Sequence, residues 1–137
     1  MNYLAKQFDL KTMTHSDTAV RYKIDNTPST EETENLKLLY ENILLPLCEA
    51  LPGQINVTNA FRCHALNAKV GGKPASQHTT GKAADIEYYE NDKENNPLLI
   101  AKIKELKLPI DQCIDEYGRW IHVSYNHGKN RGQFLKL

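Results

Sequence analysis

The chain has 137 residues, the size of one ordinary domain, and we expect residues 1–137 to form a single domain. Its 17 basic and 17 acidic side chains balance to zero net charge, so it lacks the basic surplus typical of nucleic-acid-binding proteins. Its apolar runs are too short to span a membrane. These features favour a globular domain that has neither nucleic acid nor a membrane as a partner, and they leave the oligomeric state unknown.

Three cysteines, Cys48, Cys63 and Cys113, form no C-x-x-C pair. An odd number without that spacing predicts reduced thiols, and it argues against both a disulfide framework and a thiolate zinc site. The first residues, MNYLAKQFDL, show neither the apolar core nor the cleavage pattern of a signal peptide. We therefore expect synthesis in the cytoplasm without a signal peptide.

The first part of the chain predicts helices. DTAVRYKI, residues 17–24, is expected to form one or two helical turns. Residues 29–50 predict a long helix, because Ser29 and Glu32 fit a capping box and apolar side chains then recur at the spacing of one buried helix face. Pro46 is expected to bend this helix or to interrupt its hydrogen bonds.

The rest of the chain mixes short strands and helices. The expected elements are a strand at 55–61, a helix at 64–70 closed by Gly71 and Gly72, a strand at 83–88, a loop at 89–96, a helix at 97–106, and two strands within 111–125 joined by a turn near Gly118. This order is typical of an α+β domain with a small antiparallel sheet and flanking helices.

The stretch ASQHTTGKAADIEYYE, residues 75–90, raises a metal-binding hypothesis. It places His78 and Asp85 seven residues apart, across a loop and the start of a strand. Imidazole nitrogen and carboxylate oxygen are ligands that zinc accepts in tetrahedral sites. Gly81 allows the loop to reverse tightly, because glycine tolerates positive φ. The alternative is a polar loop that contains a histidine.

A third ligand is expected from WIHVSY, residues 120–125. Strand alternation places His122 on one face and Ile121 and Val123 on the other. Because isoleucine and valine belong in a core, His122 is expected to face a cleft. A lone strand histidine is more often an ordinary polar or core residue, and that alternative stays open. The remaining histidines are expected to be solvated: His15, His64 and His127.

Taken together, these residues resemble a known family. The string S-x-H-x-x-G-x-A-x-D at Ser76–Asp85, followed by Trp120-x-His122, is similar to the motifs of zinc D-Ala-D-Ala carboxypeptidases. That group also includes the lysostaphin-type peptidases and the hedgehog signalling domain. The resemblance covers about residues 58–126, and the flanks are similar to small phage- and prophage-encoded members. It implies a hedgehog/D-Ala-D-Ala peptidase-like fold, a Zn²⁺ cofactor, and zinc ligands at His78, Asp85 and His122.

A zinc peptidase also needs a general base. The acidic pair Asp115 and Glu116 precedes the turn that leads to His122, and adjacent strand residues point to opposite faces, so only one of the pair can serve. Glu116 lies six residues before His122, a spacing similar to that of the active-site glutamate in the hedgehog branch. The D-Ala-D-Ala dipeptidases have their glutamate three residues before the histidine, where this chain has Arg119. We predict Glu116 as the base, with Asp115 or a purely structural acidic turn as alternatives.

The resemblance also suggests substrate-binding residues. Arg62, in AFRC, is expected to hold the C-terminal carboxylate of the substrate and to assist catalysis, since a guanidinium can donate two parallel hydrogen bonds. Its alternative is a surface salt bridge. Ser76 is expected either to bind substrate or to cap a turn. Trp120 stands where the lysostaphin branch has a histidine, which favours the carboxypeptidase-like branch; it either lines the cleft or packs.

The sequence thus predicts a zinc metallopeptidase that hydrolyses D-alanine-containing peptidoglycan stem peptides, of carboxypeptidase or endolysin type. We expect it to act on the cell wall after release from the cytoplasm. The bond cleaved, D-Ala-D-Ala or L-Ala-D-Glu, stays open, because both kinds of enzyme share these ligands. One alternative is a catalytically inactive, zinc-holding binding module of the same fold, and another is an unrelated α+β domain without metal.

Overall fold

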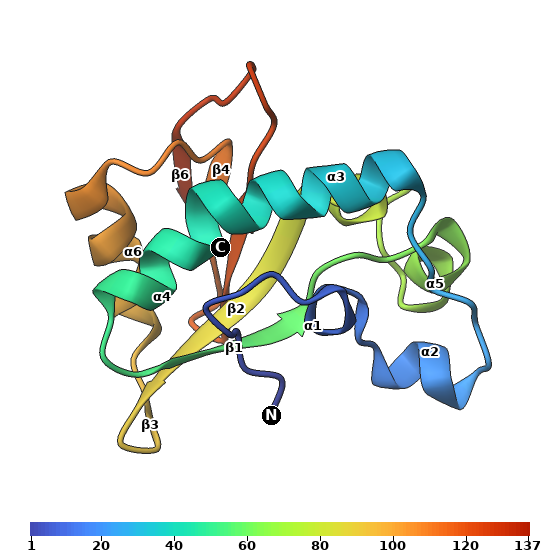
Figure 1. Ribbon diagram of the computed structural model, residues 1–137, viewed down its shortest axis with the longest axis horizontal. Coiled ribbons are helices and arrows are strands. Elements are labelled where there is room, and N and C mark those ends of the chain that lie inside the picture. Colours follow the sequence, from blue (N-terminus) through green and yellow to red (C-terminus); the bar gives the residue numbers. More distant parts are fainter.

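The computed structural model describes residues 1–137, and Figure 1 shows a sheet crossed by a long helical segment. The helical elements are α1 (Leu10–Thr14), α2 (Asp17–Arg21), α3 (Thr30–Leu39), the π-turn η1 (Tyr40–Leu44), α4 (Leu45–Ala50), α5 (His64–Lys69), the 3₁₀ turn η2 (Gln77–Thr80) and α6 (Asn96–Leu106). The strands are β1 (Gln54–Asn59), β2 (Ala83–Glu90), β3 (Lys93–Glu94), β4 (Gln112–Glu116), β5 (Trp120–Ser124) and β6 (Gln133–Lys136). The predicted α+β class is confirmed. None of the helices is both long enough and apolar enough to cross a membrane.

The long predicted helix is present as the continuous run α3–η1–α4. Its start is the predicted capping box, in which Ser29 Oγ accepts from the Glu32 N–H at 3.1 Å and the Glu32 carboxylate accepts from the Ser29 N–H at 2.8 Å. Pro46 has no N–H to donate within the helix. Just before Pro46 the helical hydrogen bonds span five residues instead of four: the Leu45 N–H donates to the Tyr40 carbonyl in a π-turn.

The sheet has the strand order β1-β2-β5-β4-β6, and β3 pairs with β2. Strands β1, β2, β5 and β4 pair antiparallel, as predicted. Two strands of the sheet, β3 and β6, were not predicted from the sequence. Strand β6 pairs with β4 in parallel. Residues 89–96, expected to form a loop, instead extend β2 and turn back as β3. Asn91 and Asp92 make that turn with φ values of 52° and 61°.

The hydrophobic core lies between the helical run and one face of the sheet (Figure 1). Ile86 on β2 and both Ile121 and Val123 on β5 are almost fully buried there, which confirms the predicted core face of β5. Side chains alternate along a strand, so the residues between them point to the opposite face. That second face carries Asp85 and His122.

Candidate metal centre

Three side chains from three elements meet on the face of the sheet opposite the core. His78 lies in η2, Asp85 in β2 and His122 in β5, and their ligand atoms all lie within 4.8 Å of one another. Asp85 and His122 are direct partners in the β2–β5 ladder, so their side chains share one face. The structure therefore brings together the three residues that the sequence predicts as metal ligands.

Two of the distances between donor atoms are close to those expected around a zinc ion. Nε2 of His78 lies 3.3 Å from Oδ2 of Asp85, and Nδ1 of His122 lies 3.0 Å from Oδ1 of Asp85. Two ligands that are each about 2.0–2.1 Å from zinc, at a tetrahedral angle, lie about 3.3 Å apart. Because the cluster supplies three donors, a tetrahedral ion held here would keep its fourth position for water or substrate.

Outer contacts orient the ligands. Nδ1 of His78 lies 2.6 Å from the carbonyl oxygen of Ala60, which can only accept, so Nδ1 carries the proton. Nε2 then faces Oδ2 of Asp85. Without a metal, a proton between these two atoms makes the contact a charged hydrogen bond; with that proton removed, Nε2 is free to bind a cation. Asn59 donates to Oδ2 of Asp85 at 3.1 Å. Such contacts are typical of zinc sites, where they fix the orientation of the ligands.

The Asp85 carboxyl is held in its ionised form. Burial alone would raise the pKa of Asp85, whose side chain is only 11% exposed. Hydrogen bonds from His122 and His78, together with the charge of these imidazoles, outweigh burial and hold the pKa well below its ordinary value. A carboxylate that stays ionised is the form that binds a cation.

The turn that carries His78 is fixed against α3. Gly81 ends η2 with φ of +76°, as predicted for a tight reversal. A Cβ at this glycine would lie 2.5 Å from the main-chain oxygen of Glu32 in α3. The Asn35 side chain, also in α3, donates to the Thr80 carbonyl at 2.9 Å. The close approach and the positive φ together explain why this position requires glycine.

The two acidic candidates for the general base point to opposite faces. Glu116 pairs with Trp120, and Ile114 pairs with His122, so Glu116 lies on the metal-site face, diagonal to His122. Asp115 pairs instead with the core residue Ile121, and its carboxylate accepts from the Gly118 N–H at 2.8 Å in the turn. This arrangement favours Glu116, and its catalytic role stays a prediction.

Arg62 lies beside the cluster with an unpaired donor. Its Nη2 donates to Ser76 Oγ at 3.4 Å, and its buried Nε has no hydrogen-bond partner. Burial lowers the pKa of the Arg62 guanidinium, and the charge of Asp85 opposes this change. Ser76 Oγ also accepts from the His78 N–H at 3.2 Å, so Ser76 does cap η2. The substrate-binding roles of Arg62 and Ser76 stay predictions.

Trp120 lies on the same face of the sheet. It is partly exposed, stands opposite Glu116 and lies two strand positions from His122. This placement favours a side chain that lines the cleft over one that packs in the core, and its contact with substrate stays a prediction.

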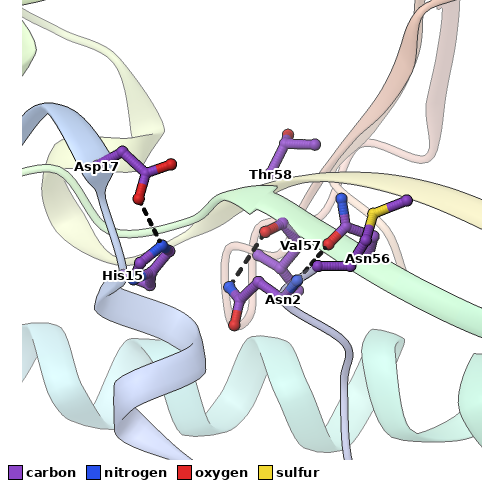
Figure 2. Close-up of a pocket in the computed structure, with 7 residues that line it drawn as sticks. Asn2, His15, Asp17, Asn56, Val57 and Thr58 are labelled. Carbon is purple, nitrogen blue, oxygen red and sulfur yellow. Dashed lines mark hydrogen bonds and ion pairs between the residues drawn. The ribbon is translucent and has the colours of Figure 1, made fainter.

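Two polar cavities lie along β1, and the smaller of them reaches the site. The larger has a volume of about 550 Å³, and Figure 2 shows His15 and Asp17, joined at 3.1 Å, facing the β1 residues Val57 and Thr58 across it. The smaller, of about 300 Å³, shares His15, Asp17 and Thr58 with the first and reaches Arg62. We call these two neighbouring cavities the trough; Arg62 lines only the smaller of them. His15, expected to be solvated, is half-exposed and lines it.

Sequence reasoning missed the groups that hold the ligands. The Ala60 carbonyl carries no sequence signal, because every residue has one. Asn59 is visible as a polar residue at the end of a predicted strand. However, an irregularity in the β1–β2 register between Val57 and Asn59 sets its pairing with Asp85, and alternation alone does not predict it.

Comparison with known proteins agrees with this geometry. A family model described as Peptidase M15 matches residues 6–124, which include all three candidate ligands, Arg62 and Glu116. A search of curated proteins finds no match. The match to the family model confirms the resemblance to the zinc D-Ala-D-Ala carboxypeptidase-like peptidases. The chain therefore belongs to the peptidase M15 family of zinc-dependent metallopeptidases.

Proposed function

We propose that this chain is a zinc-dependent peptidase that hydrolyses D-alanine-containing stem peptides of peptidoglycan. The observation that carries the proposal is the His78–Asp85–His122 cluster, whose donor atoms lie within 4.8 Å of one another on the face of the sheet opposite the core. Membership of a metallopeptidase family supports the same chemistry. A bound zinc ion supplies Lewis acidity, which acidifies a water molecule and polarises the scissile carbonyl.

The remaining chemistry falls to groups on the site face. Glu116 accepts a proton from the attacking water, whose oxygen bonds to the peptide carbonyl carbon. The C–N bond then breaks, and Glu116 returns the proton to the departing amine. Trp120 lies beside Glu116 and two strand positions from His122, so it is placed to line the substrate cleft and to exclude water.

Arg62 supports a substrate that carries a free carboxylate. Its guanidinium is partly buried, lines the trough and leaves Nε unpaired. A buried donor without a partner is costly, and a substrate carboxylate would satisfy it with charge-assisted hydrogen bonds. The trough beyond Arg62 offers polar side chains to the rest of a stem peptide, among them Asn56, Thr58 and His15.

The proposal is tested by digestion of purified muropeptides with mass analysis of the products. The wild-type chain is expected to shorten or split the peptides, a chelator to abolish this activity, and added zinc to restore it. The masses identify the bond cleaved. If the wild-type chain binds zinc but leaves every muropeptide intact, the inactive zinc-holding module is the better description.

The same assay tests the base. Glu116→Gln removes the proton acceptor with little change in shape, and we expect kcat to fall by about 10²–10⁴-fold while zinc content is retained. Asp115→Asn is the matched control, because its side chain serves the turn on the other face. Equal activity of Glu116→Gln and wild type would show that Glu116 is not the base.

A further inference from the structure

We propose that Asp111 and Gln77 form a positioning pair that sets the location of His78 relative to the other two ligands. This inference rests on the proposed metal site. Asp85 and His122 are fixed to each other as direct partners in one sheet. His78 lies outside the sheet in η2, so the geometry of the three-ligand set depends on how that turn is held.

Asp111 is anchored at the junction of three strands. It immediately precedes β4 and is only 1% exposed. Its N–H donates to the Ser124 carbonyl at the end of β5, at 2.7 Å, and its own carbonyl accepts from the Gln133 N–H at the start of β6, at 3.0 Å. The backbone of Asp111 is therefore fixed to the same sheet that carries Asp85 and His122.

The Asp111 carboxylate uses both oxygens. Oδ1 accepts from the Arg131 N–H at 3.0 Å and from its Nε at 2.9 Å. Oδ2 accepts from Nη2 of Arg131 at 2.9 Å and from the Gln77 side-chain amide at 2.9 Å. A buried carboxylate needs such partners, and the forked guanidinium leaves it one defined orientation. The oxygen that faces Gln77 is therefore held in place by Arg131.

Gln77 is the first residue of η2 and the immediate neighbour of His78. The other side of the turn is held by Asn35 from α3 and by the contact between the His78 ring and Ala60. The Gln77–Asp111 bond connects the turn to the C-terminal half of the sheet. It thereby links Arg131, far along the chain, to a metal ligand, and we assign Asp111 and Gln77 as positioning residues.

The test measures zinc affinity directly, by competition with a chromophoric chelator at pH 7, together with the melting temperature of the metal-free chain. Gln77→Ala removes the donor and leaves the Asp111–Arg131 pair intact. We expect it to weaken the zinc Kd by about tenfold with little change in melting temperature, because loss of an outer-shell contact typically costs 10–100-fold in affinity. Gln77→Glu, nearly isosteric, faces Asp111 with a like charge and is expected to weaken zinc binding further.

Gln133→Ala is the matched control. It loses an exposed side-chain hydrogen bond of 2.7 Å to Gln112, with no contact to η2, and should bind zinc as wild type does. Wild-type affinity in both Gln77 variants would overturn the positioning role and leave the proposed function intact. If the wild-type chain itself binds no zinc, the proposed function fails, and the positioning role fails with it.

Discussion

His122 shows what a single residue reveals in the sequence and what it does not. Alternation in WIHVSY predicted that Ile121 and Val123 enter the core and that His122 faces away, and the structure confirms this. The groups that orient the cluster could not be predicted in the same way. The Ala60 carbonyl and Asn59 reach it through tertiary contacts, and no local pattern encodes those contacts.

Gly81 gives a prediction at the residue scale. Gly81→Ala is expected to lower the free energy of unfolding by about 2–5 kcal/mol, because left-handed backbone costs a residue with a Cβ and that Cβ would clash with the Glu32 main chain. Gly71→Ala is the control. Its φ is +77°, but nothing lies within 4 Å of the added Cβ, so about 1–2 kcal/mol is expected. Urea denaturation measures both, and equal losses would contradict the proposed clash.

At the scale of elements, strong local signals were sufficient for the long helix, α5, α6 and the β4–β5 hairpin. The sequence did not predict a π-turn, although the interruption expected at Pro46 lies close to it. Strand β6 was not predicted, because its residues carry no burial pattern. All four of its residues are exposed, so the strand buries neither face and its sequence shows no apolar alternation.

The contact between Asp111, just before β4, and Arg131, shortly before β6, gives a pH prediction. Hydrogen bonds from the Arg131 guanidinium outweigh burial and hold the pKa of the Asp111 carboxyl well below its ordinary value. A lowered native pKa stabilises the fold above the unfolded value of about 4. This stabilisation is lost as pH falls through the native pKa, because the unfolded chain binds the proton first.

We therefore expect Asp111→Asn to destabilise the chain by about 1–3 kcal/mol at pH 7 and by progressively less as pH falls below about 4. Urea unfolding of wild type and variant across this range measures the difference between them. Asp92→Asn, in the exposed β2–β3 turn, controls for the change in net charge. A difference for Asp111→Asn that stays constant down to pH 2 would contradict the assignment.

At the scale of the whole molecule, a single cluster of 22 buried residues connects the helical run to the sheet. All three cysteines contact it: Cys113 belongs to the cluster, and Cys48 and Cys63 pack against it. Burial raises the pKa of Cys48 to about 11 and that of Cys113 to about 12. All three thiols are free.

We expect native Cys113 to resist a thiol reagent at pH 8, and Cys48 to react slowly, because only the thiolate attacks and burial suppresses it. In denaturant, all three cysteines should react at similar rates. Mass analysis of peptides after timed labelling measures each site separately. Rapid labelling of Cys113 in the folded chain would show that the core opens far more often than its packing implies.

The direct pairing of Asp85 with His122 has a further consequence for how the chain reaches its native state. Sliding β5 along β2 by a single residue would turn the imidazole toward the apolar layer and expose Ile121 and Val123 to water. The β2–β5 register and the three-ligand cluster therefore form together. The affinity of the chain for a divalent ion should then show whether the β4–β5 hairpin has paired with β2 in the native register.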